Sequence, residues 1–254
     1  NGTEGDEFAD NHETRRFINV FGKTDISLLP GWELSAGANL HFLKFKLEDN
    51  FEDEENLSGE YRYDPVLSPR LGLTGELNEN MTLFASAGHG FSPPSVEETL
   101  LPEGSINPDL KPEEGYNFDL GLRGDLFQNR IHYDVTGYYI SLENLLVTKR
   151  ESEEIFYGIN AGASAHKGIE TMLKTRLLDR SSPYRLNLNI THTLMDNEFK
   201  TFVDEGTDHS GNQLPGVPDQ HLRTSLTGGI PERPHRDLVD DGVVPPGAGG
   251  RVRG

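Results

Sequence analysis

The chain has 254 residues, a formal net charge of −19 and no cysteine, and 34% of its residues are hydrophobic. The absence of cysteine excludes disulfides, zinc–thiolate sites and cysteine nucleophiles, and the acidic balance argues against a nucleic-acid partner, which would need a basic face. The sequence lacks the long apolar run of a transmembrane helix but is compatible with a transmembrane barrel, whose strands need an apolar residue only at every second position.

The first fourteen residues, 1–14, hold five acidic side chains and no Lys or Arg. A secretory leader begins with a basic stretch followed by an apolar one, so this segment does not read as a leader. Either a leader has been removed or the chain begins inside a longer protein. We therefore expect 1–14 to be the remnant of an extracellular loop and 15–230 to be the folded domain.

Apolar and polar residues alternate with a period of two along much of the chain, and helical spacing is nowhere sustained. In 114–126, Tyr116 and Phe118 alternate with Asn117 and Asp119. Such a segment is a strand with one apolar and one polar face. About nine strands are predicted in this way, at 16–28, 32–42, 66–77, 81–91, 114–126, 131–139, 168–178, 184–194 and 221–230.

Short turns and long connections alternate along the chain. The short ones, rich in turn-forming residues, are Pro30-Gly31, 78–80, 128–129 and 179–183. The long ones cover roughly 48–64, 92–112 and 200–218, with a medium one near 150–155. Outer-membrane barrels have this alternation, whereas a β-sandwich gives no reason for it. We predict an all-β fold, an antiparallel up-and-down meander that is part of a transmembrane β-barrel.

Acidic residues gather in the long connections, so the acidity is expected at one end of the barrel, although each run also fits an ordinary solvated loop. The polar positions of the strands would line a wet lumen; they include Arg123, Asp125, Glu170, Lys174, Arg176 and Arg185. Aromatic residues near strand ends fit either an interfacial girdle or ordinary strand propensity, and both explanations stay open. These residues are Trp32, Phe91, Tyr133, Tyr139 and Tyr184.

Residues 68–124 resemble the C-terminal barrel of TonB-dependent outer-membrane receptors. The matching pieces are, in order, Ser68-Pro69-Arg70, Phe84-Ala85-Ser86, 90–94, 107–113 and 120–124. Further pieces at 157–162, 166–170 and 211–218 extend the resemblance over roughly 65–230. Proline ends strands and holds the residue before it extended, which accounts for single pieces, but ordinary strand and turn patterns do not account for their joint order.

The resemblance implies a barrel of about 22 strands with a plugged lumen, in the outer membrane of a Gram-negative bacterium. It implies active uptake of a scarce ligand, and the pieces are most similar to the branch that takes up ferric siderophores and other iron chelates. The implied partners are outer-membrane lipid, a ferric chelate and, through the plug, the TonB energy-coupling complex. No nucleic-acid partner and no cofactor are expected.

Departures from the family pattern predict a fragment. No plug domain and no TonB box are found, and nine strands cannot close a barrel of about 22 strands. Residues 231–254 hold four Pro and five Gly, a composition that forbids a barrel strand. We expect this segment to be an irregular tail, non-native or disordered, and we do not expect the chain alone to transport a ligand.

No catalytic, metal or cofactor site is predicted, and we expect the protein not to be an enzyme. The nine His residues are scattered, and the zinc-protease, serine-hydrolase and calcium-loop spacings are absent. The candidates for ligand binding are Glu97, Glu98 and Asp109, because their long connection would lie near the mouth of the barrel. Two alternatives stay open: a soluble or secreted acidic β-sandwich that binds a ligand, and a non-functional gene fragment.

Overall fold

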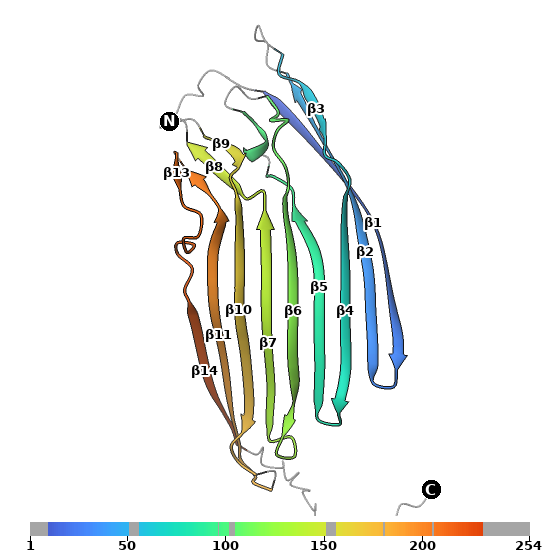
Figure 1. Ribbon diagram of the computed structural model, residues 1–254, viewed down its shortest axis with the longest axis vertical. Helices are drawn as coiled ribbons and strands as arrows, with labels where there is room; N and C mark the ends of the chain where they lie inside the picture. The colour runs from blue at the N-terminus through green and yellow to red at the C-terminus, as the bar shows by residue number, and fades with distance from the viewer. Residues whose placement is uncertain are drawn as a thin grey trace, which may run out of the picture.

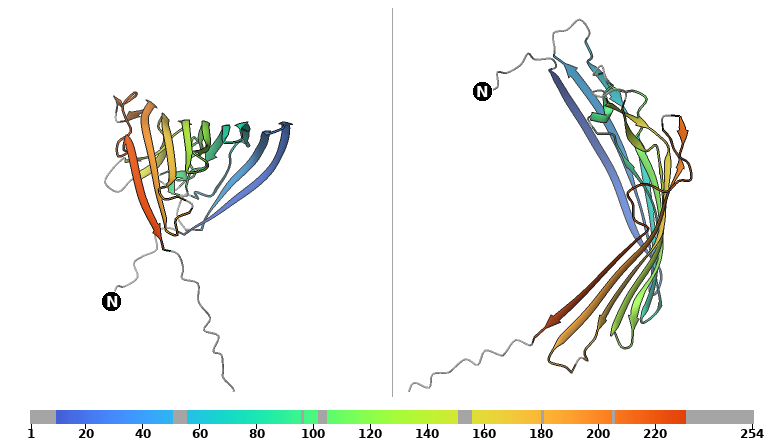
Figure 2. Two further views of the ribbon diagram at one scale, coloured as in Figure 1. Left: turned by 90° about the horizontal axis from the view of Figure 1, so that it is seen from below. Right: turned by 90° about the vertical axis from the view of Figure 1, so that its left-hand side faces the viewer.

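The computed structural model describes residues 10–50, 56–95, 97–101, 105–150, 156–179, 181–204 and 206–230, and every structural statement below concerns these residues. Ten strands form one antiparallel sheet, in which nine follow one another as neighbours in chain order. The sheet is long and curved, with its long connections gathered at one end (Figures 1 and 2). The predicted all-β meander is therefore confirmed.

The bounds of the nine strands agree with the alternation over most of their length. They are β1 (Asn11–Leu29), β2 (Trp32–Asp49), β4 (Val66–Asn78), β5 (Met81–Ser92), β6 (Glu113–Leu126), β7 (Ile131–Glu143), β10 (Ala163–Arg176), β11 (Arg185–Thr201) and β14 (Gln220–Gly229). The sheet also contains β3 (Gly59–Arg62), which pairs with β2 beyond the end of β4. The one helix described is the three-residue 3-10 helix η1 (Glu97–Thr99), and no described helix is long and apolar enough to cross a membrane.

Two connections differ from the prediction. The link expected near 150–155 is a longer one that contains the hairpin of β8 (Leu146–Arg150) and β9 (Phe156–Asn160), while 151–155 lie outside the described residues. The connection after β11 contains the small hairpin of β12 (Val203–Asp204) and β13 (Thr207–Asp208). These strands are too short for period-two alternation to be recognised in the sequence.

The described residues include only part of the two ends of the chain, so the expectations for these ends are only partly tested. Strand β1 begins at Asn11, within the segment expected to be a loop remnant, while residues 1–9 lie outside the described residues. The tail 231–254 also lies outside them, so its irregular nature stays a prediction.

Register assigns the side chains of each strand to one of two faces. Leu120 of β6 is opposite Gly137 of β7, which is opposite Ile169 of β10, which is opposite Leu194 of β11. We call the face that carries this row the apolar face. Leu120 is 60% exposed and Ile169 50% exposed, so these side chains do not pack on a second sheet.

The other face, which we call the polar face, carries the residues expected in a lumen. Arg123 is opposite Asp134, and Glu170 is opposite Thr136 and Thr193. Since side chains alternate strictly along a strand, all six predicted lumen residues fall on this face. Trp32, Phe91, Tyr133 and Tyr139 lie on the apolar face by the same rule. The ring of Phe91 also contacts the ring of His41, with 4.5 Å between the centroids.

The two faces exchange character near the long-connection end of β1 and β2. On the apolar face, the pair Ile18 and Phe42 is followed by the pair Arg16 and Lys44. On the opposite face of β2, Leu43, Phe45 and Leu47 become buried. The alternation that predicts the strand therefore stops at Phe42, although the hydrogen bonding between β1 and β2 continues to Asp49. Because the prediction relied on that alternation alone, the predicted strand ends seven residues too early.

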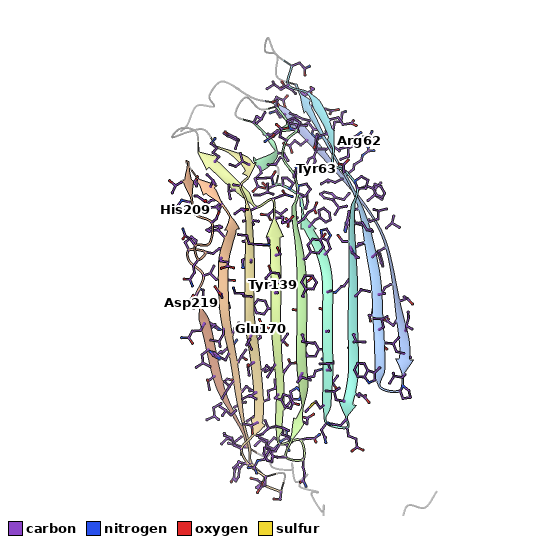
Figure 3. All side chains as sticks on the ribbon, in the orientation of Figure 1. Arg62, Tyr63, Tyr139, Glu170, His209 and Asp219 are labelled. Atoms are coloured by element: carbon purple, nitrogen blue, oxygen red, sulfur yellow. The ribbon has the colours of Figure 1, made fainter. Side chains whose placement is uncertain are left out.

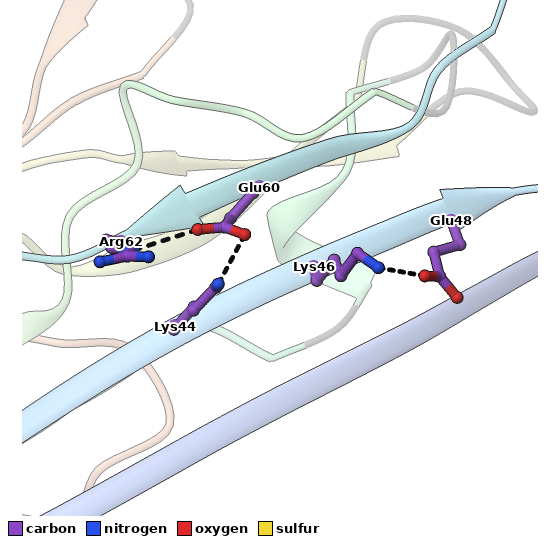
Figure 4. A network of polar contacts seen from close by, with 5 residues as sticks. All are labelled: Lys44, Lys46, Glu48, Glu60 and Arg62. Atoms are coloured by element: carbon purple, nitrogen blue, oxygen red, sulfur yellow. Dashed lines mark hydrogen bonds and ion pairs between the residues drawn. The ribbon is translucent and has the colours of Figure 1, made fainter.

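Beyond this exchange the outer surface is charged. Lys44 pairs with Glu60, Arg62 Nε lies 3.1 Å from Glu60 Oε1, and Lys46 pairs with Glu48 (Figure 4). The hydrogen bond from Lys44, with a smaller contribution from Arg62, holds the pKa of Glu60 below its usual value. A charged network of this kind belongs in water, so the exchange at Phe42 marks one edge of the apolar belt.

The belt predicts a face-dependent cost for a new charge. Leu122→Arg, on the apolar face, should lower the free energy of unfolding of the membrane-inserted protein by about 2–4 kcal/mol, the usual cost of Arg in the middle of a lipid-facing belt. Thr136→Arg, on the polar face of the adjacent strand, should cost less than about 1 kcal/mol. Denaturant unfolding in lipid vesicles measures both, and equal losses would show that the faces are wrongly assigned.

Candidate functional site

The long connections gather at one end of the sheet (Figure 1). The connection between β5 and β6 contains η1, which lies against β9. The space between them is small: a Cβ atom on Gly158 would lie 2.7 Å from the backbone oxygen of Glu98. This close approach places η1 directly against 157–162, one of the stretches that the sequence analysis recognised.

Two asparagines fasten the stretches 107–113 and 157–162 together. The Nδ2 group of Asn160 donates to the backbone oxygens of Lys111 at 2.9 Å and Asn144 at 2.8 Å, and its Oδ1 accepts from the backbone N–H of Lys111 at 2.7 Å. Asn107 Nδ2 donates to the backbone oxygen of Gly158 at 3.3 Å. The loop is thus held by side-chain amides in addition to the prolines that the sequence analysis emphasised.

The predicted ligand residues belong to this loop. Glu98 forms a capping box with Ser95, whose backbone N–H donates to Glu98 Oε2 at 2.7 Å while Glu98 N–H donates to Ser95 Oγ at 3.3 Å. Asp109 is exposed, and its backbone N–H donates to Asn107 Oδ1 at 3.1 Å. Glu97 lies in η1, and its side chain is outside the described part of the structure. The structure therefore places the three residues on one loop, with the carboxylate of Glu98 used in the capping box and Asp109 exposed.

An aromatic cluster holds the other side of the same loop. The ring of Tyr63 packs edge-on against Phe45, 5.6 Å between centroids, and against Tyr61 at 4.8 Å. The guanidinium of Arg15 lies 4.1 Å from the centroid of Phe45, and its Nη1 donates to the backbone oxygen of Pro94 at 3.2 Å. Strands β1 and β2 are thereby connected to the start of the loop, close to Tyr63 at the long-connection end (Figure 3).

Between the aromatic cluster and the loop lies a pocket of about 380 Å³. It contains the rings of Tyr61, Tyr63 and Tyr116, together with His89 and Glu114. The His89 side chain is only 5% exposed, and its Nε2 is 3.5 Å from Glu114 Oε2. Rings beside hydrogen-bonding groups suit a small polar organic ligand.

Sequence reasoning missed this pocket, because His89 stood there only as one of nine scattered His residues. The partners of His89 are Ser68, whose Oγ is 3.2 Å from Nδ1, and Tyr116, whose ring centroid is 4.8 Å away. These partners lie on the neighbouring strands β4 and β6, so only the strand pairing, not local spacing, could have revealed the contact.

A second polar group lies on the polar face of β10 and β11. His166 Nδ1 is 2.8 Å from Asn197 Oδ1, and His166 Nε2 is 3.0 Å from Ser164 Oγ. Ser164 and Asn197 are both buried. The backbone of Asn197 accepts a hydrogen bond from Leu214 N–H, so this group supports the connection between β11 and β14. In the described part of the chain, no three His, Asp or Glu side chains are arranged to hold a metal ion.

Comparison with known proteins gives a match over most of the chain. The family model described as "TonB dependent receptor-like, beta-barrel" matches residues 1–230. A probable TonB-dependent siderophore receptor, PiuA of Acinetobacter baumannii, is 24% identical over 218 residues, which are 79% of this chain and 28% of the relative. The vitamin B12 transporter BtuB of Photobacterium profundum is 30% identical over 77 residues, 30% of this chain and 12% of that protein.

Solved structures show the same fold. The ferric yersiniabactin uptake receptor FyuA of Yersinia pestis superposes with a TM-score of 0.60 at 16% identity, covering 85% of this chain and 32% of the receptor. At that identity the likeness shows the fold alone. The chain spans less than a third of the length of these relatives, and the ligands in their names differ in kind, from siderophores to vitamin B12.

The hydrogen bonds of Asn160 to Lys111 and Asn144, which we call the amide clamp, predict a local effect of Asn160→Ala. Losing three hydrogen bonds, each contributing about 1 kcal/mol, should raise hydrogen-exchange rates in 105–112 and 157–160 at least about tenfold. Asn189→Ala, which removes one bond to Ser225 on the polar face of the sheet, should leave these segments unchanged. Hydrogen-exchange mass spectrometry makes the comparison, and unaltered exchange in Asn160→Ala would disprove the clamp.

Tyr63 predicts a late step in an alkaline titration. Burial raises the pKa of Tyr63 to about 12. Tyr61 adds a smaller increase, and the positive charge of Arg15 lowers the pKa by less. Because the folded pKa lies above the unfolded value of about 10, the stabilisation is complete below pH 10 and is lost as pH rises towards 12. Ultraviolet phenolate titration should show one of the eight tyrosines ionising late, and Tyr63→Phe should remove that step.

Proposed function

The chain belongs to the β-barrel family of TonB-dependent receptors, and we propose on that premise that it forms part of an outer-membrane receptor for active uptake of a ferric siderophore or another iron chelate. The observation that carries the proposal is the match of the family model across 1–230. The single curved sheet agrees with it, because one face is apolar and exposed while the other is polar.

The sandwich alternative is wrong. A β-sandwich buries the apolar faces of two sheets against each other, whereas the described residues form one large sheet and two small hairpins. The largest apolar side chains of the middle strands are exposed on the apolar face, among them Leu120 and Ile169. The gene-fragment alternative concerns the gene and stays a prediction.

The location and partners follow as further proposals. The apolar face would contact lipid of the outer membrane of a Gram-negative bacterium, with the long connections outside the cell. The polar face would line the lumen, and the TonB energy-coupling complex would act through a plug carried by the parent protein. The family is one of receptors and transporters, and we propose that this chain likewise has no catalytic role.

For the ligand, we propose the loop 93–112 and the pocket beside it as the contributing surface. Among the acidic candidates, Asp109 is exposed, whereas Glu98 is occupied as a helix cap. Tyr61, which is opposite Phe45 on the face of β2 that continues the polar face, supplies a ring beside the same loop, whereas Glu114 and Tyr116 share the register of Phe118 and lie on the apolar face. Glu97 is retained as a candidate on the strength of its place in the loop alone.

The proposal predicts that deletion of the parent gene abolishes growth on one or a few ferric chelates. Growth of the mutant on a panel of ferric siderophores and ferric citrate, as sole iron sources, measures this. A plasmid copy of the gene should restore growth. A copy with Asp109→Asn should also restore growth, with equal amounts of protein in the outer membrane, but the variant should bind the ligand more weakly. Growth that is unchanged on every chelate, and on vitamin B12 or copper as limiting nutrient, would reject active uptake.

A further inference from the structure

Beyond Phe42, the side of the wall that continues the apolar face carries three cations in one cross-strand row. Arg16 of β1 is opposite Lys44 of β2, and Lys44 is opposite Arg62 of β3. We call these three residues the basic row. Opposite residues on neighbouring strands have Cβ atoms about 4.5–5.5 Å apart, and like charges in such positions destabilise a sheet. An anion that lies on the basic row would therefore stabilise it.

Glu60 neutralises only part of the basic row. Its carboxylate pairs with both Lys44 and Arg62 (Figure 4), yet the side chain of Arg62 is 72% exposed. Arg16 is also exposed, and within the described part of the chain no ion pair or hydrogen bond joins its side chain to another group. Three cations and one carboxylate leave two positive charges uncompensated on this surface.

This positive charge contrasts with its surroundings. The whole chain has a net charge of −19, and the connection 93–112 at the same end of the sheet holds four acidic residues and one Lys. Lys46, two residues after Lys44 on the same side of β2, pairs with Glu48 and adds no net charge. The excess of positive charge on this side of β1, β2 and β3 therefore belongs to the basic row.

The basic row adjoins the edge of the apolar belt. The next pair on the same side, towards the short turns, is Ile18 and Phe42, followed by Val20 and Leu40. Ile18 and Phe42 are 61% and 39% exposed, as expected of side chains that face hydrocarbon. Cations on the outside of a barrel are costly in the middle of the bilayer and tolerated at its interface. The basic row thus lies at the level of the lipid headgroups, with acyl chains beside Ile18 and Phe42.

The side of the membrane determines which lipid the basic row meets. In the proposed function, on which this inference rests, the long connections lie outside the cell, so the headgroups are those of the outer leaflet. The main lipid of that leaflet is lipopolysaccharide, whose lipid A part carries phosphate groups next to its acyl chains. Arg binds phosphate through two parallel hydrogen bonds, and Lys binds it as a point charge. We propose that the basic row binds a phosphate group of lipid A, with an acyl chain of the same molecule on Ile18 and Phe42.

The test uses the complete receptor that contains this chain, extracted from outer membranes in mild detergent. Native mass spectrometry would measure the binding of lipid A and of dephosphorylated lipid A. Arg16→Gln combined with Arg62→Gln should weaken lipid A binding about thirtyfold, because each cation beside an anionic lipid contributes about fivefold. Lys23→Gln combined with Arg70→Gln is the matched control, since these two cations flank Gly37 in one row of the polar face and should not affect lipid A.

A further variant should change the binding in the opposite direction. Glu60→Gln removes the carboxylate that competes with phosphate for Lys44 and Arg62, and should strengthen lipid A binding about fivefold, a gain that misfolding would not produce. Equal binding of lipid A and its dephosphorylated form, or equal losses in the two double variants, would overturn the site. The failures are distinguishable: a protein absent from the outer-membrane fraction rejects the proposed function as well, whereas a receptor that supports growth on a ferric chelate but does not discriminate between the two lipids rejects the lipid site alone.

Discussion

The cross-strand register of one antiparallel ladder determines every other feature of this structure. In a strand, neighbouring side chains point to opposite faces, so a slip of one residue would move the whole apolar set to the other face. The tight turns fix that register. Gly31, with φ of 79°, reverses the chain between β1 and β2, and the turn after β6 has three residues with positive φ, Phe127, Gln128 and Asn129. The short turns at one end thus determine which side chains of each strand face lipid and which face the lumen.

Local sequence patterns predict the sheet because the alternation of apolar and polar side chains is a property of each single strand. Alternation along single strands is enough to find nine strands and to assign Leu120 and Arg123 to opposite faces. The same rule fails beyond Phe42, where the strand leaves the belt and its faces exchange character. It also fails for the short strands β8 and β9, which belong to a loop.

The candidate site was less predictable because its contacts join distant segments. Asn107 and Gly158 are 51 residues apart, and Lys111 and Asn160 are 49 apart. The sequence shows that both stretches resemble the family, but not that a side-chain amide links them. Glu98 is a related case: its place near the mouth stays a prediction, and its use as a helix cap depends on the local fold around Ser95.

The direction of the strands has a consequence for closure. Strands β1 and β14 both run from the long-connection end to the short-turn end, since nine strands in an up-and-down meander begin and finish alike. If these two edges met directly, they would pair in parallel. An antiparallel cylinder that includes this sheet therefore needs an odd number of further strands between the two edges. This parity condition holds for any complete barrel of which these nine strands are a part, and a total of about 22 satisfies it.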